Sequence, residues 1–323
     1  MLPIAIDAMG GDRAPDEIVA AAHAAAAAGI PVILVGPADL AGVDGLPLHV
    51  ASEVIGMDDD PAQGVRRKKD STLVRAAELV RDGAASAMVS AGNTGATMAS
   101  ALLRMGRIRG VSRPAIATPL PVPGHAPNIL LDAGANAEVQ PEWLVQFAQM
   151  GTIFARHRFG VAQPRVGLLS IGEEAGKGDS LRKVAYDLLA AAPGISFAGN
   201  VEGRDALVKT VDVIVTDGFT GNVVLKTLEG GTKMLINEIK QTITATAELR
   251  VHADALAPVL EPLWTAMSPD TYGGAMLLGV DGVCIISHGS SDRFAMLNAI
   301  HVAREMVVHD VVAELTAAIA GQL

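Results

Sequence analysis

The chain has 323 residues, of which 50% are hydrophobic and only 3% aromatic, so it is long enough for one large α/β domain with a sizeable core. Its formal net charge of −10 and its pI near 5.2 argue against nucleic-acid binding, which usually needs a basic surface. One cysteine excludes an internal disulfide, and the longest apolar stretch, residues 18–35, is mostly alanine and too interrupted for a transmembrane helix.

Short apolar runs alternate with longer helical patterns along the chain. Several runs are apolar throughout, as expected for strands that are covered on both faces. The expected strands are residues 3–6, 31–35, 48–51, 87–90, 128–131, 165–170, 195–198, 211–215 and 283–286. The expected helices are one that opens at Pro15 and closes at Gly29, and residues 71–81, 94–104, 141–157, 180–191, 222–244 and 292–315. This alternation predicts an α/β fold, a three-layer α/β/α sandwich with a mostly parallel sheet.

The alternation of strands and helices is interrupted between about residues 222 and 272. A long helical pattern is followed there by Pro258, Pro262 and Pro269, and we interpret the segment as a helical excursion from a single domain of residues 1–323. Such an excursion serves a dimer interface or a substrate lid. Residues 244–269 carry three acids against one arginine, so any membrane contact is expected to be weak or peripheral. No signal peptide follows Met1, and we expect a cytoplasmic protein.

Glycines and small polar residues follow several expected strands, which is where open parallel sheets bind ligands. The loop DAMGGD at residues 7–12 places Gly10, Gly11 and Asp12 directly after the first strand. Paired glycines let backbone N–H groups approach a ligand closely, although a plain tight turn explains them equally well. The aspartates would repel a phosphate, so their expected role is to orient loops or a proton donor.

Two further loops, each between an expected strand and an expected helix, contain the same types of residue. The sequences SAGNTGA at residues 90–96 and TDGFTGN at residues 216–222 combine glycines, hydroxyls and an asparagine at a helix start. A helix N-terminus with exposed N–H groups binds anions, and capping alone is the alternative. Two such loops on one sheet are expected to converge on one anion. The residues that they offer are Asn93, Thr94, Gly95, Asp217, Gly218, Thr220, Gly221 and Asn222.

A fourth loop, SIGEEAGKGDS at residues 170–180, resembles a phosphate-binding P-loop but does not match the P-loop sequence motif. The spacing is one residue short, and Gly178 stands where a serine or threonine is required, so ATP or GTP binding is rejected. Lys177 can still place a cation against a phosphate or a developing oxyanion. The alternative is an exposed lysine paired with Glu173 or Glu174.

Three other features are candidates. Cys284 lies in the apolar run VCII and is interpreted as a structural thiol rather than a nucleophile. His288 follows the last strand and is either an acid–base group or a loop hydrogen-bonder. No histidine spacing indicates a metal site. The basic run Arg66, Arg67, Lys68 and Lys69 is a solvated loop or helix start, or a docking site for an acidic partner.

Taken together, the loops at residues 7–12, 90–96, 131–136, 171–178, 217–222 and 272–275 resemble the bacterial phosphate acyltransferase family known as PlsX. The resemblance extends from about residue 3 to about residue 310, with the motifs in the same order. It implies a fold related to isopropylmalate dehydrogenases and phosphate acetyltransferases, and a homodimer without metal or organic cofactor. Lys177 and Asn222 stand at positions associated with the family's active site.

The resemblance also implies a reaction. An acyl carrier protein thioester and inorganic phosphate would give an acyl phosphate, which feeds glycerol-phosphate acylation in phospholipid synthesis. Phosphate is a competent nucleophile and a thiol a good leaving group, so we expect direct attack without a protein nucleophile. Two alternatives stay open: a non-catalytic binder of phosphate or carrier protein, and an NAD-dependent decarboxylating dehydrogenase of the same fold, for which the metal-binding aspartates and the arginine-rich loop are missing.

Overall fold

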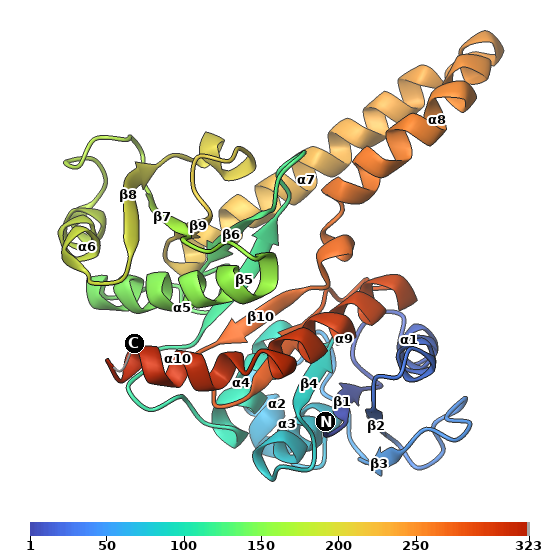
Figure 1. Cartoon of the computed structure of the whole chain (residues 1–323). Helices are drawn as coiled ribbons and strands as arrows, with labels where there is room; N and C mark the ends of the chain where they lie inside the picture. Colours follow the sequence, from blue (N-terminus) through green and yellow to red (C-terminus); the bar gives the residue numbers. More distant parts are fainter. Residues whose placement is uncertain (322–323) are drawn as a thin grey trace.

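The computed structural model describes residues 1–321 and is built on one sheet with the strand order β3-β2-β1-β4-β11-β10-β5-β6-β9-β7-β8 (Figure 1). Successive residues of a strand enter opposite cores: Ile4 and Ile6 of β1 point to one face of the sheet and Ala5 to the other. The strands are β1 (Ile4–Asp7), β2 (Val32–Gly36), β3 (Leu48–Val50), β4 (Ala87–Ser90), β5 (Ala115–Leu120), β6 (Asn128–Leu131), β7 (Arg165–Leu169), β8 (Ser196–Val201), β9 (Val213–Val215), β10 (Ala275–Leu278) and β11 (Val283–Ile286).

Helices cover both faces of this sheet, which confirms the expected α/β/α sandwich. On one face lie α1 (Asp16–Ala27), α5 (Pro141–Phe159), α6 (Ser180–Ala191), α9 (Arg293–Val308) and α10 (Val311–Ile319). On the other lie α2 (Pro61–Arg67), α3 (Thr72–Arg81), α4 (Thr94–Arg104) and the start of α7 (Gly218–Ile243). The chain also forms α8 (Ala247–Met267) and two short 3-10 helices, η1 (Gly203–Leu207) and η2 (Pro269–Tyr272).

The sheet consists of two parallel blocks that run in opposite directions. Strands β3, β2, β1, β4 and β11 form one block, and β6, β9, β7 and β8 form the other. Between them, β10 and β5 are antiparallel to each other and to their outer neighbours, so three reversals separate the blocks. The carboxyl ends of the two blocks therefore point to opposite edges of the sheet. The loops at residues 90–96 and 216–222 therefore leave the sheet in opposite directions, and their convergence on one anion stays a prediction.

Several elements differ from the sequence-based expectation. β5 was not among the expected strands. Pro119 lies within it, and proline usually marks an edge strand, yet β5 pairs on both sides. Neither α2 nor β10 was expected, and α8 continues through Pro258 and Pro262. Because α8 is exposed, water can satisfy the carbonyls that these prolines leave without a donor. The expected helix over residues 292–315 is two helices, since the chain turns at Asp310, whose φ is 50°.

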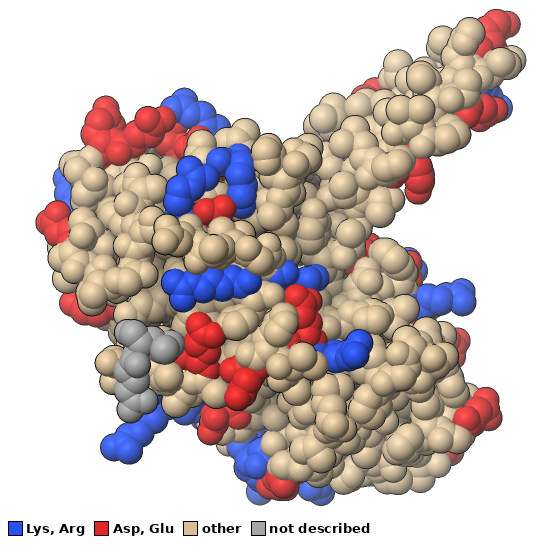
Figure 2. Space-filling view, viewed as in Figure 1, with Lys and Arg blue, Asp and Glu red and all other residues tan. Residues whose placement is uncertain are grey.

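The helices α7 and α8 form a hairpin, called here the α7–α8 hairpin, which projects from the body (Figure 1). Its surface in the view of Figure 2 carries few charged side chains apart from those near its tip. No helix within residues 1–321 has both the length and the hydropathy needed to cross a bilayer. The large apolar side chains that the hairpin exposes include Val223, Met234, Leu235, Leu249, Val251, Leu256, Val259 and Leu263.

Candidate active site

The loops that follow β1 and β4 are joined by a buried carboxylate. Asp7, the last residue of β1, accepts a hydrogen bond from Ser90 Oγ at 2.7 Å, and the N–H of Met9 donates to the same carboxylate at 3.2 Å. Burial raises the pKa of Asp7 above its usual value, against the hydrogen bonds that lower it. Asp7 therefore fixes the relative position of two loops and does not face a ligand.

The glycines of the first loop serve close contact between protein backbones. A Cβ on Gly10 would lie 2.7 Å from the backbone nitrogen of Gly92, and one on Gly11, whose φ is 107°, would lie 3.0 Å from the carbonyl oxygen of Gly289. The N–H of Asp12 donates to that same carbonyl at 2.7 Å. Close backbone packing thus explains why glycine is needed at positions 10 and 11. The carboxylate of Asp12, in contrast, is exposed.

The side chain of Asn93 is fully engaged at the start of α4. Its oxygen accepts from the N–H of Ala96 at 3.0 Å, which is the expected helix cap, and its amide donates to the carbonyls of Met57 at 2.8 Å and Asp59 at 3.1 Å. Thr94, the first residue of α4, is exposed instead. Of these two residues, Thr94 is the one that can contact a ligand.

The start of α2 packs against the same loop. A Cβ on Gly95 would lie 2.7 Å from Pro61 Cγ, so Gly95 also serves packing. Arg66 and Arg67 of the basic run lie in the last turn of α2, Lys68 is its C-terminal cap and Lys69 lies in the turn that follows, so the run is a helix end and loop rather than a helix start. Lys68 pairs with Asp59 at 2.6 Å, and the exposed remainder of the run is Arg66, Arg67 and Lys69.

Four of the predicted residues line one small cavity of about 320 Å³: Asp12, Thr94, Asn222 and His288. The first, second and fourth follow strands of the first block, and Asn222 comes from α7, which crosses from the second block. The structure therefore gathers residues from both blocks, although their strand ends point apart. The wall also includes Met57, Ile116, Thr118, Pro119, Ala133, Leu225, Lys226, Glu229, Asp270, Ala275, Ile286 and Ser287.

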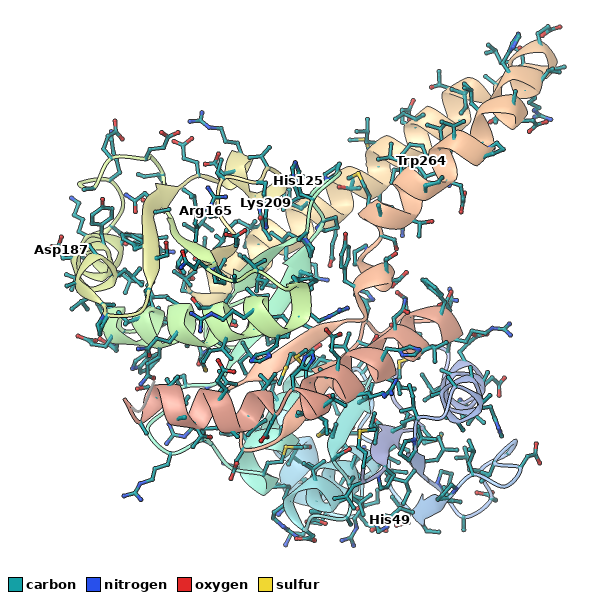
Figure 3. The ribbon with its side chains drawn as sticks, viewed as in Figure 1. His49, His125, Arg165, Asp187, Lys209 and Trp264 are labelled. Atoms are coloured by element: carbon teal, nitrogen blue, oxygen red, sulfur yellow. The ribbon has the colours of Figure 1, made fainter. Side chains whose placement is uncertain are left out.

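A second cavity, of about 630 Å³, adjoins the first under the base of the α7–α8 hairpin. Both cavities are lined by Leu225, Lys226, Glu229 and His288, so they meet along α7. Trp264, labelled in Figure 3, is carried by α8 near the base of the hairpin and lines the larger cavity. The other large apolar side chains of its wall are Leu120, Leu207, Leu228, Ile236 and Met267.

Lys226 is a charged residue at this junction that the sequence analysis did not select. Its Nζ lies 2.7 Å from Glu229 Oε2 and 3.5 Å from His288 Nε2. His288 is held in turn by Ser290, whose Oγ lies 2.9 Å from Nδ1. Lys226 follows Asn222 by four residues, and this helical spacing, which places both on one face, is the signal that could have identified it.

Arg182, in α6, is a second residue that was not among the predicted site residues. Its guanidinium is buried and forms an ion pair with Asp217, and it also donates to Thr216 Oγ1 and Thr220 Oγ1 at 3.2 Å each. Burial would raise the pKa of Asp217, but hydrogen bonds from Thr220 and the charge of Arg182 outweigh it and lower that pKa. Asp217 and Thr220 are therefore engaged in a structural cluster.

The start of α7 is likewise fixed by packing. Asp217 caps the helix by accepting from the N–H of Thr220 at 2.8 Å, so the expectation that Asn222 opens the helix is wrong. A Cβ on Gly218 would lie 2.7 Å from the carbonyl oxygen of Asn136, and one on Gly221 would overlap that of Asp132. Asn222, in contrast, is exposed to the small cavity.

Lys177 lies in the exposed loop between β7 and α6. Its side chain lies against Gly172, where an added Cβ would be 2.9 Å from Lys177 Cγ. Because β7 adjoins β9, this loop is at the same sheet edge as the start of α7. Lys177 lines neither cavity, so the structure does not bring it together with His288.

Cys284 lies within β11 and is completely buried, as expected of a structural thiol. Burial raises the pKa of the Cys284 thiol to about 12. A thiol in that state is neither accessible nor ionised at neutral pH, which excludes it as a nucleophile.

The whole fold matches solved structures at low sequence identity. A branched-chain phosphotransacylase from Enterococcus faecalis V583 superimposes with a TM-score of 0.61 and 14% identity, over 95% of this chain and 99% of that chain. A 4-hydroxythreonine-4-phosphate dehydrogenase from Klebsiella pneumoniae does so with a TM-score of 0.54 and 15% identity, over 95% and 100%. The protein thus has the fold shared by phosphotransacylases and this class of dehydrogenases.

Sequence comparison is more specific. A family model described as "Fatty acid synthesis protein" matches residues 2–314. A phosphate acyltransferase from Desulfitobacterium hafniense (strain Y51) is 49% identical, over 98% of this chain and 96% of the relative. The chain therefore belongs to the phosphate acyltransferase family, as the loop motifs predict. This confirms that it is an enzyme and an acyltransferase, and it disfavours both alternatives.

Proposed function

We propose that the protein transfers a fatty acyl group from the thioester of an acyl carrier protein to inorganic phosphate, giving an acyl phosphate for phospholipid synthesis. The observation that carries the proposal is the joining of a small cavity, which contains Thr94, Asn222 and His288, to a larger one that is lined by several large apolar side chains. Phosphate fits the first and an acyl chain the second, and the reacting carbonyl would lie where they meet. An acetyl group would not need a cavity of about 630 Å³.

The chemistry needs no covalent intermediate on the protein. An oxygen of hydrogenphosphate attacks the thioester carbon, a C–O bond forms, and the carbonyl electrons move to the carbonyl oxygen. When they return, the C–S bond breaks and the thiolate takes the proton that hydrogenphosphate carried. Charge and atoms balance without a cofactor. The buried state of Cys284 supports this direct route.

The protein's task is to hold an anion and to stabilise the oxyanion. Asn222 and the exposed start of α4 at Thr94 would offer donors to phosphate, and His288, which lines the same cavity, would carry the proton toward the departing thiolate. Lys177 remains a proposed catalytic residue, and its approach to the site would require movement of the loop between β7 and α6. Gly10, Gly11, Asn93, Gly95, Asp217, Gly218, Thr220 and Gly221 would act by shaping the site.

The partners follow from the same reaction. Acyl carrier proteins are acidic, and the exposed residues Arg66, Arg67 and Lys69 end a helix whose first residue packs against the loop at Gly95. We include a homodimer formed through the exposed apolar side chains of the α7–α8 hairpin. A cytoplasmic location, weak peripheral membrane contact and a glycerol-phosphate acyltransferase downstream complete the proposal.

The test is product identification. The full chain is incubated with purified acyl carrier protein loaded with a long-chain acyl group, and thiol release is followed with and without phosphate. We expect release that depends on phosphate and a product that hydroxylamine converts to a hydroxamate. Cys284→Ala is the control and should retain activity. Absence of phosphate-dependent release would identify a non-catalytic binder instead.

A further inference from the structure

Lys226 lies where the two cavities of the site meet. It lines both of them, and its Nζ is within 3.5 Å of His288 Nε2 while it pairs with Glu229 at 2.7 Å. An ammonium group has three N–H donors, so the bond to Glu229 leaves two, of which one faces His288 Nε2 at 3.5 Å. The pairing with Glu229 also positions the lysine before substrate binds.

The charges around the small cavity show why this cation matters. In the part of the chain that the structure describes, no other lysine or arginine lines that cavity, whereas Asp12, Glu229 and Asp270 do. A phosphate dianion placed there would face three carboxylates. Dipoles at the start of α4 contribute about half an elementary charge, which is too little to offset them. Lys233 lines only the larger cavity.

The position of Lys226 on α7 gives it a neighbour. Asn222 is four residues earlier, so its amide lies on the same face of the helix, one turn nearer the body. His288, in the loop that follows β11, approaches Lys226 at this cavity, with 3.5 Å between Nε2 and Nζ. These three side chains therefore surround one space from two sides, as required for a group that is attacked on one side and released on the other.

We propose, on the basis of the function proposed above, that Lys226 is a catalytic residue whose ammonium contacts both the attacking phosphate and the thioester carbonyl oxygen. As the C–O bond forms and negative charge moves to the carbonyl oxygen, the ammonium donates a hydrogen bond to it. The charge returns when the C–S bond breaks, and the ammonium keeps its proton throughout. Lys226 thus supplies the cation that Lys177, outside both cavities, does not supply in this structure.

The experiment compares Lys226→Met, which removes the charge but keeps most of the length, with wild type and Lys226→Arg. Lys226→Met should lose on the order of 10²-fold in kcat/KM for phosphate, as expected for a preorganised oxyanion donor. The KM for phosphate should rise while the KM for the acyl carrier protein changes little. Lys226→Arg should recover part of the activity, because it keeps the charge with another shape. Lys240→Met, on the same helix but outside both cavities, is the matched control.

A binding measurement separates this inference from the proposed function. Phosphate should raise the melting temperature of the wild type and of Lys240→Met, and this rise should be absent or much smaller in Lys226→Met. If the wild type shows that rise but no phosphate-dependent thiol release, the anion site stands and the proposed reaction fails. If the wild type turns over and folded Lys226→Met keeps phosphate kinetics within about threefold, a change of roughly 0.7 kcal/mol, Lys226 is not catalytic.

Discussion

Every residue of β1, β4, β6, β9 and β11 is buried, whereas the described part of the α7–α8 hairpin buries only Gly218, Gly221 and Ala253. The body is therefore stabilised mainly by burial of apolar surface on both faces of its sheet, at about 25 cal/mol per Å². The hairpin has little such burial, so it depends on local helix formation and on whatever packs against its exposed apolar side chains.

The glycines of α7 show the same contrast within one helix. Gly221, at the body, has no room for a methyl group beside the backbone of Asp132. Gly231, three turns further out, has nothing within 4 Å of where a Cβ would be. The candidate site lies between the packed body and the exposed hairpin: its glycine loops belong to the body, whereas Lys226 and Glu229 lie on the more open part of α7.

The largest effect is expected from Gly221→Ala. The new Cβ would overlap the carbonyl oxygen of Asp132, which is backbone and cannot move aside cheaply. We expect a loss of about 3 kcal/mol in the free energy of unfolding, together with loss of activity, because the start of α7 must shift. Urea unfolding monitored by circular dichroism measures this. A wild-type unfolding midpoint would mean that α7 is not tightly docked on the body.

The second largest effect is expected on catalysis rather than on stability. It tests whether residues of both the body and the α7–α8 hairpin act in the site. Asn222→Ala, at the base of the hairpin, and Lys177→Ala, in the body, should each cost on the order of 10²-fold in kcat/KM for phosphate. Because Asp217 caps α7, Asn222→Ala should leave the melting temperature unchanged. Near-normal phosphate kinetics in folded Lys177→Ala would restrict the site to the cavity around Asn222, Lys226 and His288.

Much of the fold could be predicted because its signals are local. Strands β4, β6 and β11 match the expected ranges, since four consecutive buried residues leave a short apolar run in the sequence. The reversal between the two blocks could not be predicted, because it depends on β5 and β10, which carry no clear signal: Pro119 argues against the first. Strand direction is a property of the tertiary connections rather than of any segment.

The site was predictable to a similar extent. Asp12, Thr94 and His288, which line the small cavity, could be selected because they follow strands, where ligand sites are expected. Lys226 was missed because it lies within a helix, where only its spacing from Asn222 indicates a shared face. Arg182 was missed because burial of an arginine depends on a partner distant in sequence, here Asp217, 35 residues later.

A smaller effect, of opposite sign, is expected for Gly231→Ala in the hairpin. Alanine in the middle of a helix is favoured over glycine by about 1 kcal/mol, and no atom obstructs the new methyl group. The variant should therefore unfold at a slightly higher urea concentration than wild type and keep its activity. A loss of stability, or loss of the proposed dimer in light scattering, would show that another chain packs closely on Gly231.

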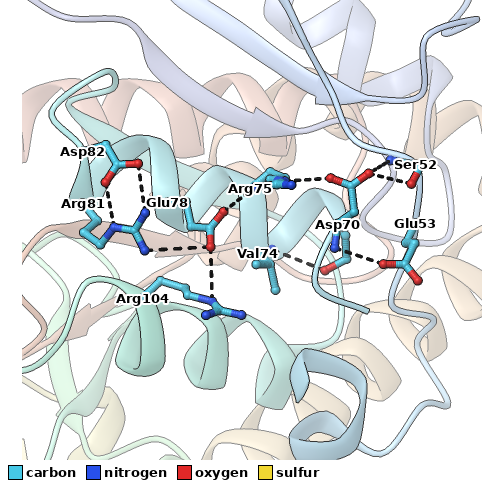
Figure 4. A network of polar contacts seen from close by, with 10 residues as sticks. Ser52, Glu53, Asp70, Val74, Arg75, Glu78, Arg81, Asp82 and Arg104 are labelled. Atoms are coloured by element: carbon cyan, nitrogen blue, oxygen red, sulfur yellow. Dashed lines mark hydrogen bonds and ion pairs between the residues drawn. The ribbon is translucent and has the colours of Figure 1, made fainter. Parts of the chain in front are cut away.

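The smallest effect is expected on the surface of the body, at Asp70. In the polar network of Figure 4, its carboxylate accepts from Ser52 Oγ at 2.6 Å and from Arg75 Nε at 2.7 Å. These hydrogen bonds, that of Ser52 foremost, lower the pKa of Asp70 from 3.8 to about 2. Since the folded pKa is below the unfolded one, the stabilisation is complete above about pH 4 and is lost as the pH falls toward 2.

Asp70→Asn should thus have a slightly lower melting temperature than wild type at pH 7, and the difference should shrink between pH 4 and pH 2. Asp254→Asn, on exposed α8, is the matched control and should follow wild type at each pH. A difference for Asp70→Asn that stayed constant down to pH 2 would mean that the network does not favour the ionised carboxylate, and that this part of the body surface is no more organised than the hairpin.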